Sequence, residues 1–122
     1  MLVNFNADLE PVPFPRPQSH GKARFNPKRY SDFKDALGYI AKTAFRGQAP
    51  FQGEVKLSAD FYRPKPKRSD KVSYIGDVDN YLKAVMDSLI GIAYLDDRQV
   101  VEIHARKIFG NPHIEIELEE LP

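Results

Sequence analysis

Residues 53–63, GEVKLSADFYR, alternate between apolar and polar side chains. The apolar set is Val55, Leu57, Ala59 and Phe61. Successive side chains of a β-strand point to opposite faces, so this period of two predicts a strand with one buried face. Such a strand needs neighbouring strands and a covering layer, which limits the fold to a sheet packed against other elements.

Two further segments carry apolar side chains at helical spacing and predict two amphipathic helices. In residues 28–45 the stripe consists of Tyr30, Phe33, Leu37, Ile40, Ala41 and Ala44. In residues 77–91 it consists of Leu82, Val85, Met86 and Leu89. Pro27 lies near the start of the first helix and Gly47 beyond its end, while Gly91 can supply the left-handed residue that ends the second.

Three shorter segments complete the predicted strands. Residues 1–9 form the first, and residues 100–109 and 113–121 form two strands joined at GNP in a hairpin-like connection. The proline-rich segment 10–27 and the basic segment 63–76 are predicted loops, because proline removes backbone donors. The order β-α-β-α-β-β predicts an α+β fold, a small mixed sheet with two helices packed on it.

Residues 1–122 have the length of a single domain. We find no apolar run near the roughly 20 residues that span a bilayer and no signal-peptide pattern, so we expect a cytoplasmic protein. The absence of cysteine excludes disulfides and thiolate-bound zinc. In the last strand Glu115, Glu117 and Glu119 alternate with apolar residues, and we expect them to face solvent or to protect a sheet edge.

Charge divides the chain into two unlike halves. Residues 1–76 contain 14 Lys and Arg and 7 Asp and Glu, a balance of +7, whereas residues 77–122 contain 4 and 10, a balance of −6. This asymmetry suggests a polyanionic partner that meets a site needing negative charge of its own. Chance clustering on two solvated faces is the alternative interpretation.

Five aspartates lie within residues 77–97, together with one lysine and no arginine. Asp77 and Asp79 stand two apart at the entry to the second helix, where both can point at one ion. Helix capping explains one such aspartate but not two. Lys83 and Asp87 follow at intervals of four on the same side of the helix, where an exposed ladder of salt bridges is the alternative.

Asp96 and Asp97 follow the helix in a turn, a common place for paired aspartates. If the chain folds back tightly, they join the carboxylates at the helix entry. Oxygen ligands of this kind suit Mg²⁺ or Mn²⁺, and two such ions can activate water and stabilise the leaving oxygen of a phosphodiester. Lys83 could neutralise charge that develops on the phosphate. Metal-like spacing is absent among the histidines, which are His20, His104 and His113.

The run DVDNYLKAVMDSL, followed by LDDRQVV, resembles the RusA family of Holliday-junction resolvases from bacteria and their phages. That family's pattern is D-x-D-N-x-x-K-x-x-x-D-x-L and then D-D-x-x-V. A weaker likeness runs through PRPQSHGKARFNPKRYSDFKDAL. The resemblance implies a homodimer that cuts four-way DNA junctions with Mg²⁺. One departure is the stretch VSYIG before the first acid, where some members carry an arginine run.

Carried over residue by residue, the resemblance places the family's metal-binding acids on Asp77, Asp79 and Asp97, with Asp96 as the neighbouring acid. Lys83 falls on the catalytic lysine, while Asn80 and Asp87 fall on supporting positions. The candidate phosphate contacts are Arg16, Lys22, Arg24, Lys65, Lys67 and Arg68, for each of which loop solubility is the alternative. Tyr62 and Tyr74 bracket the basic loop and could stack on an opened base, with packing on the sheet as the favoured alternative for Tyr62.

The sequence therefore predicts a Mg²⁺-dependent endodeoxyribonuclease on branched DNA, with Mn²⁺ as a substitute ion. A homodimer would supply two sites for the two cuts that resolve a junction. One alternative is a flap or fork nuclease with the same chemistry. The other is a protein that binds branched DNA without catalysis, its aspartates serving as caps and salt bridges.

Overall fold

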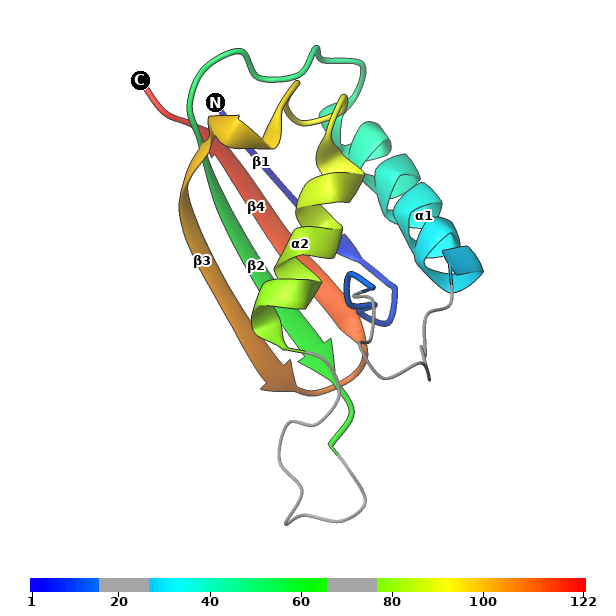
Figure 1. Ribbon diagram of the computed structural model, residues 1–122. Coiled ribbons are helices and arrows are strands. Elements are labelled where there is room, and N and C mark those ends of the chain that lie inside the picture. The colour runs from blue at the N-terminus through cyan, green and yellow to red at the C-terminus, as the bar shows by residue number, and fades with distance from the viewer. Residues whose placement is uncertain (16–26, 66–76) are drawn as a thin grey trace.

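The computed structural model of the protein describes residues 1–15, 27–65 and 77–122. These residues form one mixed sheet and two helices that pack on it (Figure 1). The elements in chain order are β1 (Leu2–Ala7), α1 (Pro27–Phe45), β2 (Val55–Arg63), α2 (Val78–Leu89), the 3₁₀ helix η1 (Asp97–Gln99), β3 (Val100–Phe109) and β4 (His113–Glu120). The predicted α+β class and element order are confirmed. Across these described ranges, no helix is both long enough and apolar enough to span a membrane.

The sheet has the strand order β1-β4-β2-β3, so β1 and β3 lie at its two edges. β2 runs parallel to β3 and antiparallel to β4, and β4 runs antiparallel to β1. The predicted hairpin between the last two strands is wrong, because β2 lies between them. Their connection crosses the end of β2, where the Gly110 N–H donates to the Arg63 carbonyl oxygen at 2.8 Å. A Cβ at Gly110 would meet the Tyr62 ring at 3.0 Å, so glycine permits this close crossing.

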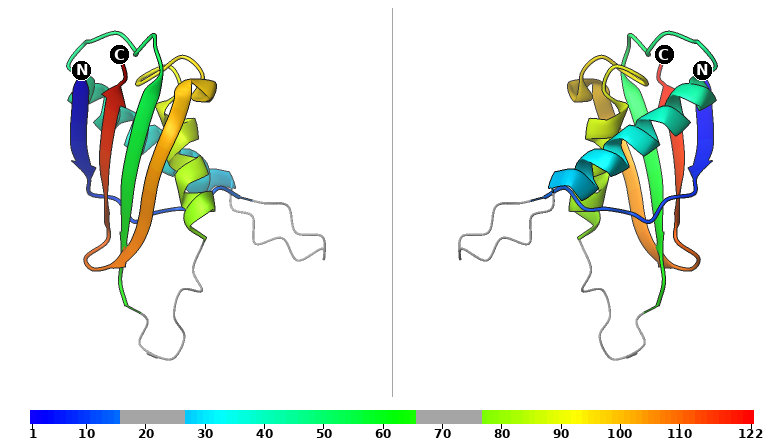
Figure 2. Two further views of the ribbon diagram at one scale, coloured as in Figure 1. Left: turned by 90° about the vertical axis from the view of Figure 1, so that its left-hand side faces the viewer. Right: turned by 90° about the vertical axis from the view of Figure 1, so that its right-hand side faces the viewer.

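Both helices cover the same face of the sheet, as the two side views show (Figure 2). The alternation predicted in β2 is confirmed, because its apolar side chains are all buried beneath the helices. The helices contribute to the same core mainly through Phe33, Leu37, Ala41, Val85 and Leu89. Burial of each large aliphatic or aromatic side chain of this kind stabilises the fold by about 1.5–3 kcal/mol. Gly91, with a φ of 85°, follows the end of α2 as predicted.

The opposite face of the sheet carries the alternate, polar side chains of the strands. Its acidic members are Asp60, Glu102, Glu115, Glu117 and Glu119. Three pairs at 2.9 Å join strand residues on this face: His104 with Glu102, His113 with Glu115, and Arg106 with Asp60. The β4 glutamates face solvent as predicted, but they protect no edge, because β4 is a central strand. We call this surface the acidic face.

Candidate functional site

Asp77 and Asp79 lie at the start of α2, and both side chains are exposed. Asp77 is the N-cap residue, with extended backbone angles of φ −86° and ψ 151°. Its backbone oxygen accepts hydrogen bonds from the N–H groups of Asn80 and Tyr81, both at 3.1 Å. Its side chain, however, makes no capping hydrogen bond. The capping interpretation therefore does not account for the Asp77 carboxylate.

Asn80 follows Asp79 in the first turn of α2. Its backbone oxygen accepts a hydrogen bond of 2.9 Å from the Phe14 N–H, which fixes the segment before residue 16 against the first turn of α2. Its side-chain oxygen is buried and has no donor among the residues that the structure describes. A buried acceptor without a donor is costly, by about 1–3 kcal/mol. Two carboxylates and such an amide oxygen, within four consecutive residues, are oxygen donors of the kind that a hard divalent cation takes.

A buried arginine also lies beside the first turns of α2. Arg63, at the end of β2, is 8% exposed, and its Nη1 donates to the Tyr81 hydroxyl. The Tyr81 ring stacks on Phe61 with a centroid separation of 5.4 Å. Burial raises the pKa of Tyr81, while the charge of Arg63 opposes that rise. A positive charge is thus held against the first turn of α2, the helix that begins at these aspartates.

Sequence reasoning placed Arg63 where the predicted strand 53–63 meets the basic loop 63–76, and it missed this role. A signal was nevertheless present. Arg63 continues the alternation of Val55 to Phe61 onto the buried face of β2. An arginine at a position that the pattern assigns to the core needs a buried partner, because an unpaired buried charge is strongly unfavourable.

Lys83 lies one turn beyond Asp79, with its side chain exposed. Its ammonium nitrogen is 4.7 Å from the centroid of the Phe14 ring, and that ring meets Tyr30 edge to face with centroids 5.5 Å apart. A cation over an aromatic face is attracted by the ring quadrupole. Phe14 therefore orients Lys83 near the start of α2, a role that the sequence pattern did not indicate.

Asp87 links the two helices. The Tyr30 hydroxyl on α1 donates to its carboxylate at 3.0 Å. Burial, and then the hydrogen bond to Asp87, raise the pKa of Tyr30 well above its usual range. Asp87 thus accepts a hydrogen bond from a tyrosine on the other helix. The alternative interpretation paired Asp87 with Lys83 on its own helix. This contact ties the last turn of α2 to α1.

Asp96 is the N-cap residue of η1, and its carboxylate accepts a hydrogen bond from the Arg98 backbone N–H at 2.9 Å. Gln99 completes a capping box by accepting from the Asp96 N–H at 3.1 Å. The carboxylate also pairs with the Arg98 guanidinium at 3.1 Å. These hydrogen bonds hold the pKa of Asp96 below its usual range. Capping chemistry accounts for this aspartate.

Asp97 is half-buried and lies near Tyr94, whose hydroxyl donates to the Met86 backbone oxygen at 2.8 Å. Burial raises the pKa of Tyr94, and the negative charges of Asp97 and Asp87 add to the rise. Asp97 therefore lies near the C-terminal half of α2, away from its start.

The two acidic segments occupy opposite ends of the sheet. Val100, three residues after Asp97, pairs with Val55 at the start of β2, whereas the first turns of α2 contact Arg63 at its end. The nine residues of β2 span about 26 Å. Figure 1 shows α2 running between these ends. In the described part of the chain, no three metal-binding side chains cluster, so one chain does not bring Asp77 and Asp79 to Asp97.

Most of the predicted phosphate contacts lie outside the described residues. These are Arg16, Lys22, Arg24, Lys67 and Arg68. His20 and Tyr74 also lie outside the described residues. Lys65 is described and exposed, two residues beyond the end of β2 and on the same end of the sheet as Asp77. The Tyr62 ring stacks on His113 with centroids 4.1 Å apart, in agreement with sheet packing.

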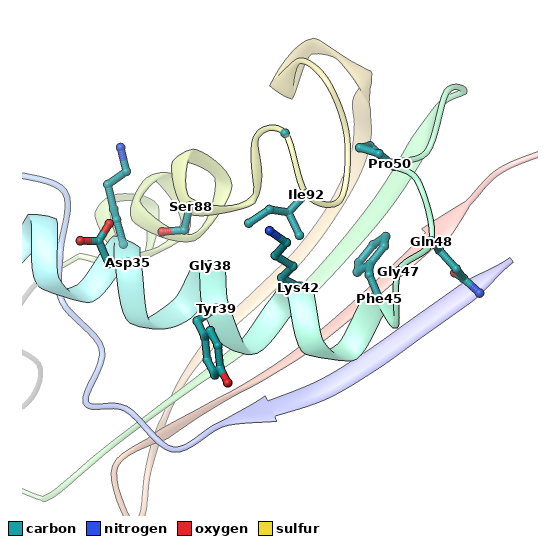
Figure 3. Close-up of a pocket in the computed structure, with 12 residues that line it drawn as sticks. Asp35, Gly38, Tyr39, Lys42, Phe45, Gly47, Gln48, Pro50, Ser88 and Ile92 are labelled. Carbon is teal, nitrogen blue, oxygen red and sulfur yellow. The ribbon is translucent and has the colours of Figure 1, made fainter.

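A groove of 620 Å³ lies between α1 and the turn that follows α2 (Figure 3). Lys42 and Phe45 on α1 and Ile92 in the turn are among its lining residues. None of the candidate acids lines it, nor does Lys83. The groove is therefore separate from the site proposed on sequence grounds.

Comparison with known proteins identifies a family and a similar protein. The family model for endodeoxyribonuclease RusA matches residues 8–119. The chain is also similar to the uncharacterized protein YqaN of Bacillus subtilis (strain 168), with 29% identity over 138 residues that cover 98% of this chain and 96% of that protein. The family match begins just after β1 and ends within β4, so it covers both helices and the strands β2 and β3. The chain therefore belongs to the RusA family of endodeoxyribonucleases.

Proposed function

We propose that the protein is a homodimeric, Mg²⁺-dependent endonuclease that resolves four-way DNA junctions by paired nicks. Family membership supports nuclease chemistry on DNA. The observation that carries the proposal is the start of α2, where Asp77 is an N-cap residue whose carboxylate makes no capping hydrogen bond, and where Asp79 and Asn80 follow within the first turn. A structural cap would use the Asp77 carboxylate to accept from the backbone N–H groups of the helix.

The residues that would hold the ion are Asp77 and Asp79, with the Asn80 oxygen as a further donor. When bound, Mg²⁺ supplies positive charge and Lewis acidity at the scissile phosphate. Hydrolysis transfers the oxygen of water to phosphorus and releases one sugar oxygen. Lys83, oriented by Phe14, would hold positive charge against the phosphate as negative charge develops there.

Asp97 would complete the site from a second subunit. Within one chain it lies about the length of β2 away from Asp77. A two-fold axis between two copies reverses the direction of one sheet relative to the other, so it can place unlike ends side by side. In such a dimer each site combines Asp77 and Asp79 with the partner's Asp97. The same axis supplies two sites for two cuts.

Complementation between inactive subunits tests this arrangement. Asp77→Asn and Asp97→Asn should each abolish Mg²⁺-dependent nicking as homodimers, with a fall of at least about 10³-fold. A heterodimer of the two, purified through two different affinity tags, contains one doubly altered site and one intact site. We expect it to recover about half of the wild-type nicking rate. Single nicks should replace paired ones.

The intrachain arrangement makes the opposite prediction, because every site of the heterodimer would then carry one altered residue. A heterodimer as inactive as its parents would therefore exclude the shared site. A heterodimer of Asp77→Asn with Asp79→Asn is the matched control, because Asp77 and Asp79 of one subunit belong to the same site. Its two sites each lack one ligand, so no recovery is expected.

Substrate preference separates junction resolution from the alternatives. Cleavage of synthetic four-way junctions, flaps, forks and duplexes should show symmetric paired nicks on junctions and little cutting of the others. Preferred flap cutting would instead favour a flap nuclease. Asp97→Asn should leave junction binding intact or tighter, because a negative charge near phosphate is removed. A wild-type protein that binds junctions but never nicks in Mg²⁺ or Mn²⁺ would support the binding-only alternative.

A further inference from the structure

β3 is an unusual edge strand. It has ten residues, it pairs only with β2, and within the described residues nothing covers its outer side. It also exposes three large apolar side chains, Val101 at 52%, Ile103 at 42% and Phe109 at 47%. A long, apolar, unpaired edge is a template for pairing with another strand. Figure 2 shows the full length of β3 at this edge.

The other edge strand differs. β1 is shorter, with six residues, and two of its outward side chains are Asn4 and Asn6. Short, polar strands are among the features that protect a sheet edge from association. The apolar exposure on edge strands is therefore concentrated on β3, with Leu2 on β1 as the exception.

We propose that β3 pairs with β3 of a second copy of this chain, antiparallel about a two-fold axis, to form one sheet across the dimer. Side chains directly opposite each other in an antiparallel pair share a face. On the acidic face β3 carries Glu102, His104 and Arg106 in alternation. When His104 lies opposite its own copy, Glu102 lies opposite the partner's Arg106, and the reverse pair forms as well.

This register is self-complementary in charge, as a two-fold interface requires. On the helix side of the sheet it places Ile103 against the partner's Ala105, so that an exposed isoleucine gains an apolar neighbour. Opposite charges in cross-strand pairs are favourable, whereas like charges directly opposite each other are destabilising. A shift that centred Arg106 on the axis would place two arginines opposite each other.

The antiparallel arrangement also carries the start of each β3 to the end of the partner's β3. Asp97 lies three residues before β3, and Arg63 at the end of β2 pairs with Phe109 at the end of β3. The partner's Asp97 is thereby brought to the end of the sheet where α2 begins. This second argument rests on the shared site proposed above, whereas the exposed edge and the charge register do not.

Single introduced cysteines test the interface, because the chain has no cysteine of its own. Opposite Cα atoms of an antiparallel pair are about 4.5–5.5 Å apart, which lies within the range that a disulfide bridges. His104→Cys should therefore cross-link to its own copy under mild oxidation, giving covalent dimer on a non-reducing gel. His104 is exposed on the sheet surface, so the variant should keep the wild-type circular dichroism spectrum.

Neighbouring positions report the register. Ile103→Cys and Ala105→Cys lie beside the axis and should cross-link much less than His104→Cys. Asn4→Cys on β1 is the control for random collision at the opposite edge, and it should stay monomeric on the gel. Cross-linking at Asn4→Cys but not at His104→Cys, or a monomeric wild type by light scattering, would overturn the β3 interface.

Nicking assays on the same variants separate this inference from the proposed function. A dimer that cross-links through His104→Cys but never nicks DNA would keep the interface and refute the nuclease. In the opposite outcome, heterodimers recover nicking, but His104→Cys does not cross-link. That result would keep the shared site and refute β3 as the interface. A second variant, Ile103→Lys, should weaken dimerisation at least tenfold, as measured by light scattering over a dilution series.

Discussion

Asp77 at the start of α2 and Asp96 at the start of η1 are both N-cap residues with extended backbone angles, yet only Asp96 caps its helix. The Asp96 carboxylate is engaged by Arg98, and Gln99 closes the capping box. The Asp77 carboxylate is exposed and makes no capping hydrogen bond. The same residue type at the same helix position can thus have two roles, and the capping hydrogen bond distinguishes them.

After the loss of a candidate metal ligand, the next largest expected effect concerns the basic residue one turn beyond Asp79. Lys83→Ala should lower the rate of junction nicking by about 100-fold while changing the dissociation constant for junctions by less than threefold, because Lys83 acts on charge that develops during the reaction. Single-turnover cleavage and gel-shift titrations provide the two measurements. The matched control is Lys34→Ala, since Lys34 also lies over an aromatic ring, that of Tyr30, at 5.6 Å.

Equal losses of rate and affinity in Lys83→Ala would make this lysine an ordinary phosphate contact. Only the aspartates would then distinguish the chemistry of the two ends of the sheet. Lys34→Ala should change neither quantity.

The contact between α1 and the last turn of α2 offers a variant that changes none of the candidate metal ligands. Tyr30→Phe removes the hydrogen bond to Asp87 and keeps the ring that packs on Phe14. We expect it to lower the free energy of unfolding by about 1 kcal/mol, as measured by urea denaturation. Tyr39→Phe, at a side chain that is 75% exposed, should cost much less. Equal costs would show that the hydrogen bond between the helices adds no stability.

A smaller effect tests the two N-cap residues against each other. Asp96→Ala should lower the melting temperature by a few degrees, because the capping box of η1 is lost. Asp77→Ala should leave it nearly unchanged, since that side chain makes no capping hydrogen bond. Thermal denaturation followed by circular dichroism measures both. A larger loss for Asp77→Ala would reassign it as a structural cap.

The smallest effect is a dependence on pH at the η1 end. Hydrogen bonds from Arg98 lower the pKa of Asp96 in the folded state, so its charged form contributes stability above its ordinary pKa. That contribution is lost as the pH falls through the lowered value. The difference in melting temperature between wild type and Asp96→Ala should therefore shrink below about pH 4. Asp96→Asn, which keeps a capping oxygen, should show less of this pH dependence.

The fold followed from local patterns because its elements have strong periodicity. The alternation of Val55 to Phe61 and the helical stripe through Leu37 and Leu89 predicted the two layers correctly. Strand pairing did not follow from these patterns. A short GNP link suggested a hairpin, but pairing depends on which apolar faces fit together, and β2 lies between the two last strands.

The site could be predicted in its residue types and not in its arrangement. The spacing of Asp77 and Asp79 indicated their common location, since it depends only on local geometry. The position of Asp97 depends on the direction in which β3 leaves η1, and no local signal encodes that direction. The contacts of Arg63 and Phe14 likewise bridge segments far apart in the sequence.

The one-sided placement of the helices has a consequence for how a nucleic acid can approach. The acidic face, with Asp60 and the β4 glutamates, repels a phosphate backbone, whereas α2 and the candidate acids that need a cation lie on the other side. In a dimer joined through β3 about an axis perpendicular to the sheet, both subunits present α2 on the same side. A single DNA molecule resting there can reach both cutting centres at once, without passing around the protein.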